Sequence, residues 1–343
     1  MLDLASIHQA AEIIKKGGLV AFPTETVYGL GADAFNPLAV ARIFEVKQRP
    51  YFDPLIVHVS DPADMKKLVI KIPLNAKKLI KRFWPGPLTV VLLKKEEVPD
   101  IVNAGLSTVA IRMPKHPMAL SLIEHANCPI AAPSANLFGY LSPTTAEHVQ
   151  DQLGDQIDFI LDGGPCEVGV ESTIISLSER EPRLLRPGGV PLEEIESVIG
   201  RVQVPVGEEG RPSAPGMLPR HYAPRTPILL DWEDKNFDSN KGEKIGLLAF
   251  GESKRSLNFH YVEILSKKGD FREAAANLFA AIRRLDSLHL DLILAETVPE
   301  VGLGRAIMDR LRRASTQQPS LAPASRQAGE GAEGRETELE NET

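Results

Sequence analysis

The sequence predicts an α/β or α+β protein made of two globular domains. Short apolar runs of strand length alternate with amphipathic segments of helix length, a pattern typical of sheets covered by helices. The chain has 343 residues, more than a single hydrophobic core usually organises. A proline-rich stretch separates a long first part from a shorter second part. We therefore predict a first domain over residues 1–203, a linker over 204–227, a small domain over 228–313 and a disordered acidic tail over 314–343.

The composition excludes several classes of protein. With 43% hydrophobic and 25% charged residues, and with neither a membrane-length apolar run nor a signal peptide, the chain is expected to be cytoplasmic and to make no membrane contact. The net charge of −7 argues against a broad nucleic-acid surface, but it is compatible with a local basic pocket for a phosphorylated small molecule. Cys128 and Cys166 lack the spacing of a zinc or redox motif, so we interpret them as reduced structural thiols.

In the first domain, many short strands are interspersed with helices, which indicates an α+β or α/β domain. We expect Ser6 to cap the first helix and Asn36 to cap the second, which opens with Pro37. Thr144 and Glu147 fit a capping box for a helix that reaches Leu153. Strands are expected over residues 19–22, 55–59, 88–93, 107–112, 130–132, 159–162, 170–175 and 184–186, and further helices over 62–69, 74–83 and 192–199.

Hydroxyls and cations follow many of these strand ends. The stretch from Val20 to Gly31 passes from an apolar strand through Pro23 into threonines, a glutamate and a tyrosine. Because α/β sheets bind ligands beyond the carboxyl ends of their strands, we expect such side chains to meet in one pocket. The residues that share this placement are Thr24, Thr26, Lys47, Arg49, Thr108, Arg112, Ser134, Ser142, Ser172 and Arg186. Several cations among many hydroxyls suit a polyphosphate together with a small carboxylate.

Each of these residues also has a purely structural interpretation. The stretch from Val20 to Gly31 fits an ordinary turn after a strand, and Lys47 with Arg49 suits the dipole at the end of a helix. His58 stands alone in an apolar run, where a histidine is more often a core residue than a ligand. On the residues alone these alternatives stay open.

The linker and the second domain carry fewer signals. Five prolines between residues 211 and 227 exclude a helix or a central strand there. Within this stretch, Arg220-His221-Tyr222 either reaches back over a pocket or belongs to a plain spacer. Strands expected over 228–230, 244–250, 261–265 and 290–295, with helices over 270–288 and 305–313, predict a small Rossmann-like α/β domain. Gly302-x-Gly304 lacks the strand and acidic residue of a dinucleotide-binding motif, so we do not predict such a site.

Taken together, these motifs carry a resemblance to a known family. The segments that carry it are Phe22-Pro23-Thr24-Glu25-Thr26-Val27-Tyr28-Gly29-Leu30-Gly31, Lys47-x-Arg49-Pro50 before Pro54-Leu55, Ser107-Thr108-Val109-Ala110-Ile111-Arg112, Pro133-Ser134-Ala135-Asn136, Ser172-Thr173, Pro215-Gly216-Met217 and Arg220-His221-Tyr222-Ala223-Pro224. In this order they resemble the long, two-domain form of the YrdC-like family over about residues 5–313. The resemblance implies a twisted open mixed sheet with flanking helices, followed by a smaller C-terminal α/β domain.

The resemblance also implies an activity. It is the conversion of L-threonine, bicarbonate and ATP into L-threonylcarbamoyl-AMP and pyrophosphate, for the threonylcarbamoyladenosine modification at position 37 of tRNAs that read ANN codons. The family pattern assigns threonine binding to Thr24, His58, Arg112, Ala132 and Ser172, with Arg112 pairing the carboxylate, and catalysis to Lys47 and Arg49. It assigns ATP binding to Lys47, Tyr51, Thr108, Ser134, Asn136, Ser142, Arg186 and Tyr222.

The expected cofactor is Mg²⁺, bound with ATP, although no carboxylate cluster in the sequence identifies its ligands. The expected partner is a tRNA threonylcarbamoyltransferase that receives the product, so contact with tRNA is indirect.

Two departures from the family pattern and two rival interpretations accompany this expectation. Asp53 stands where the family more often has asparagine, which places a negative charge near the expected phosphates, and the acidic tail has no counterpart. Glu25 is left without one role, since it could position a base, bind magnesium or cap a turn.

A different carbamoyl-adenylate enzyme would resemble hydrogenase-maturation proteins, whose acylphosphatase and zinc-finger segments are missing here. A nonenzymatic RNA-binding module would need a basic excess with interleaved aromatics, which the sequence lacks.

Overall fold

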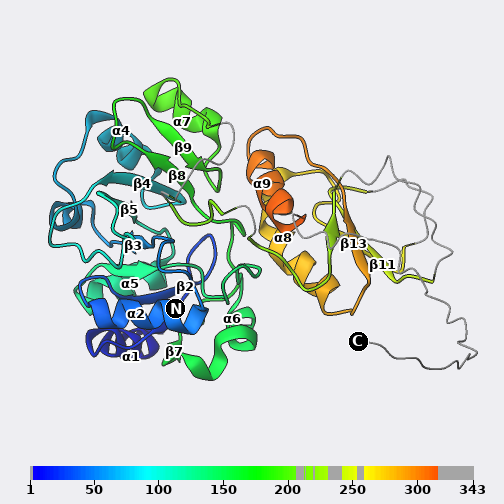
Figure 1. Cartoon of the computed structure of the whole chain (residues 1–343), viewed down its shortest axis with the longest axis horizontal. Helices are drawn as coiled ribbons and strands as arrows, with labels where there is room; N and C mark the ends of the chain where they lie inside the picture. The colour runs from blue at the N-terminus through cyan, green and yellow to red at the C-terminus, as the bar shows by residue number, and fades with distance from the viewer. Residues whose placement is uncertain are drawn as a thin grey trace, which may run out of the picture.

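The computed structural model describes residues 3–205, 212, 214–218, 221–230, 242–252 and 259–315. These residues form two units, each built on its own sheet, and the larger unit holds the N-terminal part of the chain (Figure 1). Arg220 and residues 316–343, which include most of the expected acidic tail, lie outside the described residues. Within the described part, no helix is both long and apolar enough to cross a membrane.

The larger unit is built on a mixed sheet, in which the structure describes nine strands. Their order across the sheet is β7 (Phe159–Ile160), β1 (Val20–Phe22), β2 (Gly29–Asp33), β6 (Ile130–Ala132), β3 (Ile56–His58), β5 (Thr108–Arg112), β4 (Leu88–Leu93), β8 (Thr173–Ser176) and β9 (Arg183–Arg186). The pairs β1 with β7, β3 with β5 and β4 with β8 are parallel, and the other neighbours are antiparallel. The predicted mixed sheet is therefore confirmed.

The structure corrects one part of the expectation for the stretch from Val20 to Gly31. We expected a polar turn through Gly31, but Gly29–Asp33 is a strand, β2, that pairs antiparallel with β1 and β6. The sequence signal for this strand is weak because it contains two glycines, which are unfavourable in strands. Residues 23–28 consequently form a short loop between two paired strands, which fixes the positions of Thr24 and Thr26.

The helices of the larger unit agree with the expected segments in type except α5, which the sequence analysis did not predict, and two caps differ. They are α1 (Leu4–Lys15), α2 (Pro37–Lys47), α3 (Met65–Leu68), α4 (Leu74–Phe83), α5 (Pro117–Ala126), α6 (Ala146–Leu153) and α7 (Leu192–Ile199), with short 3₁₀ turns η1 (Pro62–Asp64) and η2 (Gly154–Gln156). Asp3 caps α1 in place of Ser6, because its carboxylate accepts a hydrogen bond from the Ser6 amide at 3.2 Å. Thr145 caps α6 in place of Thr144, since its hydroxyl accepts a bond from the His148 amide.

The two faces of the large sheet are covered differently. Helices α2, α3, α4, α6 and α7 bury one face in the largest apolar cluster. On the opposite face, α1 and α5 pack over β1 and β6 at one end of the sheet, together with Phe159 of β7. The rest of this face carries Ile56 and Ala110, against which the linker residues Ala214 and Met217 pack. A part of the sheet is thus left for the linker to cover.

The smaller unit is a parallel sheet packed against two helices. Its elements are β10 (Ile228–Leu229), β11 (Ile245–Ala249), β12 (Tyr261–Ile264), α8 (Phe271–Asp286), β13 (Leu292–Ala295) and α9 (Gly304–Ser315), and the strand order is β10-β13-β11-β12. All of its strand pairs are parallel. This arrangement agrees with the small α/β domain that the sequence predicts.

Helices α8 and α9 connect the two units. They lie on the side of the small sheet that faces the larger unit (Figure 1). Their apolar residues share one buried cluster with Val27, Leu141 and Val170 of the larger unit and with Tyr222 of the linker. The Arg283 guanidinium of α8 also donates a hydrogen bond to the Leu141 carbonyl. The smaller unit is therefore packed directly beside the loops that follow β1 and precede β8.

Candidate active site

A pocket lies on the part of the large sheet that α1 and α5 leave uncovered. Strands β3, β5 and β6 form its base, and the linker residues Pro215, Gly216, His221 and Tyr222 close it from above. The lining residues are Thr24, Thr26, Val27, Gly29, Arg49, Ile56, His58, Arg112, Ala132, Pro133, Ser134, Glu171, Ser172, Arg186, Pro215, Gly216, His221 and Tyr222. The free volume is about 40 Å³, which holds water but not a nucleotide. Most of the residues predicted from the strand ends therefore meet in one place.

Thr24 is fixed by the loop between β1 and β2. Its hydroxyl donates to the Val27 carbonyl at 2.6 Å and accepts the amide of Val27 at 3.2 Å. The hydroxyls of Thr24 and Thr26 are also hydrogen-bonded, at 2.8 Å. Such side-chain to backbone bonds are typical of threonine in tight turns. They set the position of both hydroxyls at the pocket wall.

Arg112 ends β5 and is held by three partners. Its Nη2 forms an ion pair with Glu25 Oε1 at 2.8 Å, its Nη1 donates to the Thr26 hydroxyl at 2.9 Å, and its Nε donates to the Gly86 carbonyl at 3.3 Å. Both charged side chains of the pair are buried. Glu25, which had no single role in the sequence analysis, thus fixes the guanidinium and does not line the pocket itself.

His58 lies beside Arg112 in the sheet, because β3 and β5 are parallel neighbours with His58 opposite Arg112. Burial, and to a lesser degree the Arg112 guanidinium, lowers the pKa of His58 to about 3. The imidazole is therefore neutral at physiological pH. Its Nδ1 is buried and has no hydrogen-bond partner among the described residues, which leaves a polar atom available to a ligand.

Ser172 and Arg186 form the opposite wall. The Ser172 hydroxyl is hydrogen-bonded to that of Thr89 at 2.7 Å. The Arg186 guanidinium donates to the Ser172 carbonyl at 3.0 Å and to the Pro215 carbonyl at 3.1 Å. Arg186 thereby ties strand β9 to the loop before β8 and to the linker. No carboxylate among the described residues forms an ion pair with it.

Arg49 is paired with the residue that departs from the family pattern. Its Nη2 lies 2.9 Å from the Asp53 carboxylate, and it also donates to the carbonyls of Asp53 at 3.1 Å and Pro54 at 2.8 Å. Both side chains are buried. Burial raises the pKa of Asp53, and the Arg49 guanidinium counteracts that rise. The Asp53 carboxylate is thus paired with Arg49, so it does not face the pocket as an unpaired negative charge.

Lys47 lies behind the pocket wall and does not line it. Its ammonium donates to the Ser134 carbonyl at 2.7 Å and to the Asn136 carbonyl. Burial lowers its pKa well below the ordinary value. In this structure Lys47 therefore holds the backbone of residues 134–136, and one of the three ammonium donors is left for another acceptor.

Four other predicted ATP ligands lie outside the pocket. Tyr51 is exposed and stacks on Phe44 with ring centroids 5.1 Å apart. Thr108 begins β5, at the end of the strand opposite to Arg112. The Asn136 amide donates to backbone carbonyls of its own loop, and the Ser142 hydroxyl donates to the Glu171 carboxylate at 2.5 Å. None of these four lines the pocket, although Ser142 is bonded to Glu171, which does.

Tyr222 reaches the pocket from the linker in a left-handed backbone conformation, with φ of 62°. The centroid of its ring lies 4.0 Å from that of the His221 ring and 5.5 Å from that of the Phe279 ring on α8. Burial raises the pKa of its hydroxyl to about 12. Gly216 fits above this hydroxyl, since a Cβ there would lie 2.7 Å from the Tyr222 oxygen.

Sequence reasoning did not select Glu171 as a pocket residue, and it left open whether His221 reaches back over the pocket. Both stand next to residues that it did select, Ser172 and Tyr222. Adjacency was the available signal, but a glutamate beside a proposed phosphate site gave no reason of its own to be chosen.

The electrostatics of the pocket suit anions. Three guanidinium groups, of Arg49, Arg112 and Arg186, meet at its wall, while Glu171 supplies one carboxylate. Guanidinium groups bind carboxylates and phosphates with paired hydrogen bonds. Among the described residues no group of three His, Cys, Asp or Glu side chains could hold a metal ion. A metal bound here would have to take most of its ligands from a phosphorylated substrate.

Two family models match the chain. The Sua5–YciO–YrdC model, described as "Telomere recombination", matches residues 12–188. The model described as "Threonylcarbamoyl-AMP synthase, C-terminal domain" matches residues 190–316.

Curated relatives and solved structures agree with these models. The chain is 47% identical to "Threonylcarbamoyl-AMP synthase" of Pyrococcus abyssi over 324 residues, 90% of this chain and 94% of the relative. It is 45% identical to the protein of the same name in Bacillus subtilis over 320 residues, 90% of this chain and 92% of the relative. The crystal structure of Pyrococcus abyssi Sua5 complexed with L-threonine superposes with a TM-score of 0.86 at 47% identity, covering 92% of this chain and 96% of that one.

Proposed function

The chain belongs to the threonylcarbamoyl-AMP synthase family, and from that premise we propose that it converts L-threonine, bicarbonate and ATP into L-threonylcarbamoyl-AMP and pyrophosphate. One observation carries the proposal. A single buried pocket joins Thr24, His58, Arg112 and Ser172, the set expected to hold threonine, to Arg49, Ser134 and Arg186, the set expected to face ATP.

Arg112 can hold the carboxylate of threonine without losing its present partners. A guanidinium has five N–H donors: Thr26 and Gly86 accept hydrogen bonds from two of them, and Nη2 faces Glu25 in an ion pair without a hydrogen bond. One N–H remains on each Nη atom, as a bidentate carboxylate requires. The neighbouring His58 is neutral, so it can hydrogen-bond to the amino acid without repelling its amino group.

The reaction then requires positioning and charge more than covalent chemistry. Carbamoylated threonine attacks the α-phosphorus of ATP, and negative charge develops on the phosphate oxygens. Arg49 and Arg186 line the pocket and would face these oxygens, and Lys47 holds the backbone of Ser134, which also lines it. Preorganised cations of this kind stabilise the transition state because they need no rearrangement. Mg²⁺ bound with ATP would neutralise further phosphate charge.

ATP binding requires a change in the linker. The present free volume of about 40 Å³ is too small for a nucleotide. Ala214 and Met217 cover Ile56 and Ala110, on the part of the sheet that leads from Arg112 toward Thr108. Withdrawal of these linker residues would extend the pocket along β5 toward Thr108. The predicted contact of Thr108 with ATP belongs to that opened state.

The remaining parts of the proposal concern the cellular context. The product would pass to a tRNA threonylcarbamoyltransferase for the modification at position 37, so that tRNA does not itself bind in the pocket. A cytoplasmic location, where ATP and tRNA are both present, and a requirement for Mg²⁺ complete the proposal.

The test is pyrophosphate release by the full chain. We expect release that requires ATP, Mg²⁺, bicarbonate and L-threonine together. L-Valine, which has the shape of threonine without its hydroxyl, is the matched control and should support little release. ATP turnover that is indifferent to threonine would refute the substrate assignment.

A further inference from the structure

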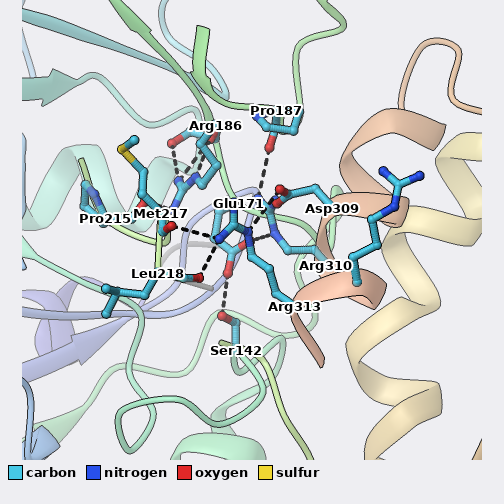
Figure 2. A network of polar contacts seen from close by, with 12 residues as sticks. Ser142, Glu171, Arg186, Pro187, Pro215, Met217, Leu218, Asp309, Arg310 and Arg313 are labelled. Atoms are coloured by element: carbon cyan, nitrogen blue, oxygen red, sulfur yellow. Dashed lines mark hydrogen bonds and ion pairs between the residues drawn. The ribbon is translucent and has the colours of Figure 1, made fainter. Parts of the chain in front are cut away.

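A buried network of charged side chains joins the smaller unit to the pocket. Figure 2 shows its members converging from three places: Ser142 and Glu171 from the larger unit, Met217 from the linker, and Arg310 with Arg313 from α9. Glu171 lines the pocket and Arg310 does not. The proposed function gives α9 no role in the reaction.

Arg310 is the centre of this network. Its side chain is 1% exposed, and its Nε lies 2.8 Å from Glu171 Oε2. Its Nη2 donates to the Pro187 carbonyl at 3.1 Å, next to Arg186 in the chain, and its Nη1 is paired with Asp309. The guanidinium carbon also lies 4.9 Å above the centre of the Tyr222 ring. One side chain of the smaller unit thus contacts both the pocket wall and the residue that closes the pocket.

The contact with Glu171 controls the charge of the pocket. Burial alone would raise the pKa of Glu171, but Arg310 and then Arg186 outweigh this effect and lower it to about 2. Glu171 is therefore ionised, and Arg310 is the cation paired with it. The donors of Arg186 go to Ser172 and Pro215 instead, and none of them bonds to Glu171. Without Arg310, Glu171 would repel a polyphosphate and would attract Arg186 away from it.

Arg313 and Asp309 support the same arrangement from the next turn of α9. Arg313 donates to the Met217 carbonyl at 2.9 Å and to the Leu218 carbonyl. Asp309 accepts from Arg313 at 3.0 Å and is also paired with Arg310. The linker that covers the pocket is thereby held against α9 by the residues that fix Arg310.

We infer that Arg310 is a positioning residue for the ATP side of the pocket, which acts from the C-terminal unit by neutralising Glu171 and so keeping Arg186 out of an ion pair with that carboxylate and in place to meet the polyphosphate. The inference rests on the proposed function, because it takes ATP as the substrate that meets Arg186. It gives the smaller unit a defined part in catalysis. It also predicts that losing Arg310 weakens ATP binding through the unpaired charge of Glu171 and spares threonine binding, whereas the loss of a merely structural contact between two units would not act on ATP alone.

The test is a double-mutant cycle in the full chain, with R310M, E171Q and R310M/E171Q. ATP affinity is measured by calorimetric titration, and the KM values for ATP and L-threonine are measured by pyrophosphate release. R284M is the matched control, since Arg284 forms an exposed ion pair with Glu263 in the same unit.

We expect R310M to raise the Kd and KM for ATP at least about tenfold while the KM for threonine changes by less than about threefold. The Kd and KM of E171Q, whatever their own change, serve as the reference, and the double variant should fall within about threefold of them. An ATP affinity that is unchanged in R310M, or one that is equally weak in R310M and R310M/E171Q, would overturn the inference.

Two further measurements keep the test decisive. If R310M does not fold, R310K takes its place: it keeps the charge, should raise the KM for ATP by about threefold, and should again be relieved by E171Q. Absence of relief in R310K/E171Q would count against the inference. If the unmodified chain releases no pyrophosphate, the proposed function fails, whereas calorimetric titration with ATP still decides the role of Arg310.

Discussion

Gly169 is the position where one added methyl group should separate the two units. It lies two residues before Glu171 and has a left-handed backbone with φ of 73°. A Cβ at this position would lie 2.4 Å from the carbonyl oxygen of Ala275 and 2.4 Å from the Cα of Ala276, both on α8. These are backbone atoms, so the contact can be relieved only by moving the helix or the loop.

The expected cost of Gly169→Ala has two parts. The left-handed conformation costs an alanine about 1–2 kcal/mol. Overpacking against the backbone of α8 adds about 1–3 kcal/mol. The free energy of unfolding should therefore fall by about 2–5 kcal/mol. Because α8 also carries Phe279, which packs on Tyr222, the KM for ATP should rise as well.

Gly164→Ala is the matched control. Gly164 has nearly the same backbone, with φ of 77°, but nothing lies within 4 Å of the position of its Cβ. This variant should lose only the conformational part, about 1–2 kcal/mol, and should keep its KM for ATP. Urea unfolding and pyrophosphate release of both variants supply the comparison. Equal losses of stability with equal KM values in the two variants would refute the packing of α8 on the Gly169 loop.

Four further outcomes follow from the pocket. Arg112→Gln should raise the KM for threonine by about 10- to 100-fold and leave the ATP affinity measured by calorimetric titration unchanged; an unaltered threonine KM would remove Arg112 from the site. Lys47→Met should lower the free energy of unfolding by about 1–3 kcal/mol and suppress ATP turnover, because two buried carbonyls lose their donor; full activity at full stability would contradict this. Since the pKa of His58 falls to about 3 on folding, only the unfolded chain takes up its proton below about pH 6.5, so stability should be lost as the pH falls. Between about pH 7.5 and about pH 5.5, His58 should lower the free energy of unfolding measured in urea by about 1.4 kcal/mol. In His58→Asn this contribution to the pH dependence should be absent. An identical pH dependence in the variant would show that His58 does not stay neutral. Chelation of Mg²⁺ should stop pyrophosphate release without weakening threonine binding, and release that persists in excess EDTA would exclude the metal.

The sequence was sufficient for the parts of the fold that local patterns determine. Apolar periodicity located the helices α2 and α8, which each bury one face, and continuous apolar runs located the strands β4 and β5, which are buried almost throughout. It missed β2, whose glycines weaken the strand signal, and whose stability comes from pairing with both β1 and β6. Contacts with neighbouring strands are not visible in a local sequence pattern.

In the candidate site too, local sequence patterns pointed to side chains but not to their partners. Thr24, Arg112 and Arg186 could be chosen because each follows or ends a strand. The pairing of Glu171 with Arg310 spans 139 residues and two units, so no spacing in the sequence points to it. The position of Lys47 was predicted near the site, but its bonds to backbone carbonyls depend on how the loop of residues 134–136 folds. Sequence reasoning thus selected side chains by chemistry and could not assign their partners.

The incorporation of carbon from bicarbonate tests the central claim most directly. The full chain is incubated with carbon-labelled bicarbonate, L-threonine, ATP and Mg²⁺, and the products are separated. The proposed function predicts label in one product that also contains threonine and AMP, in an amount equal to the pyrophosphate released. Pyrophosphate release without labelled product, or a labelled product that lacks threonine, would contradict it.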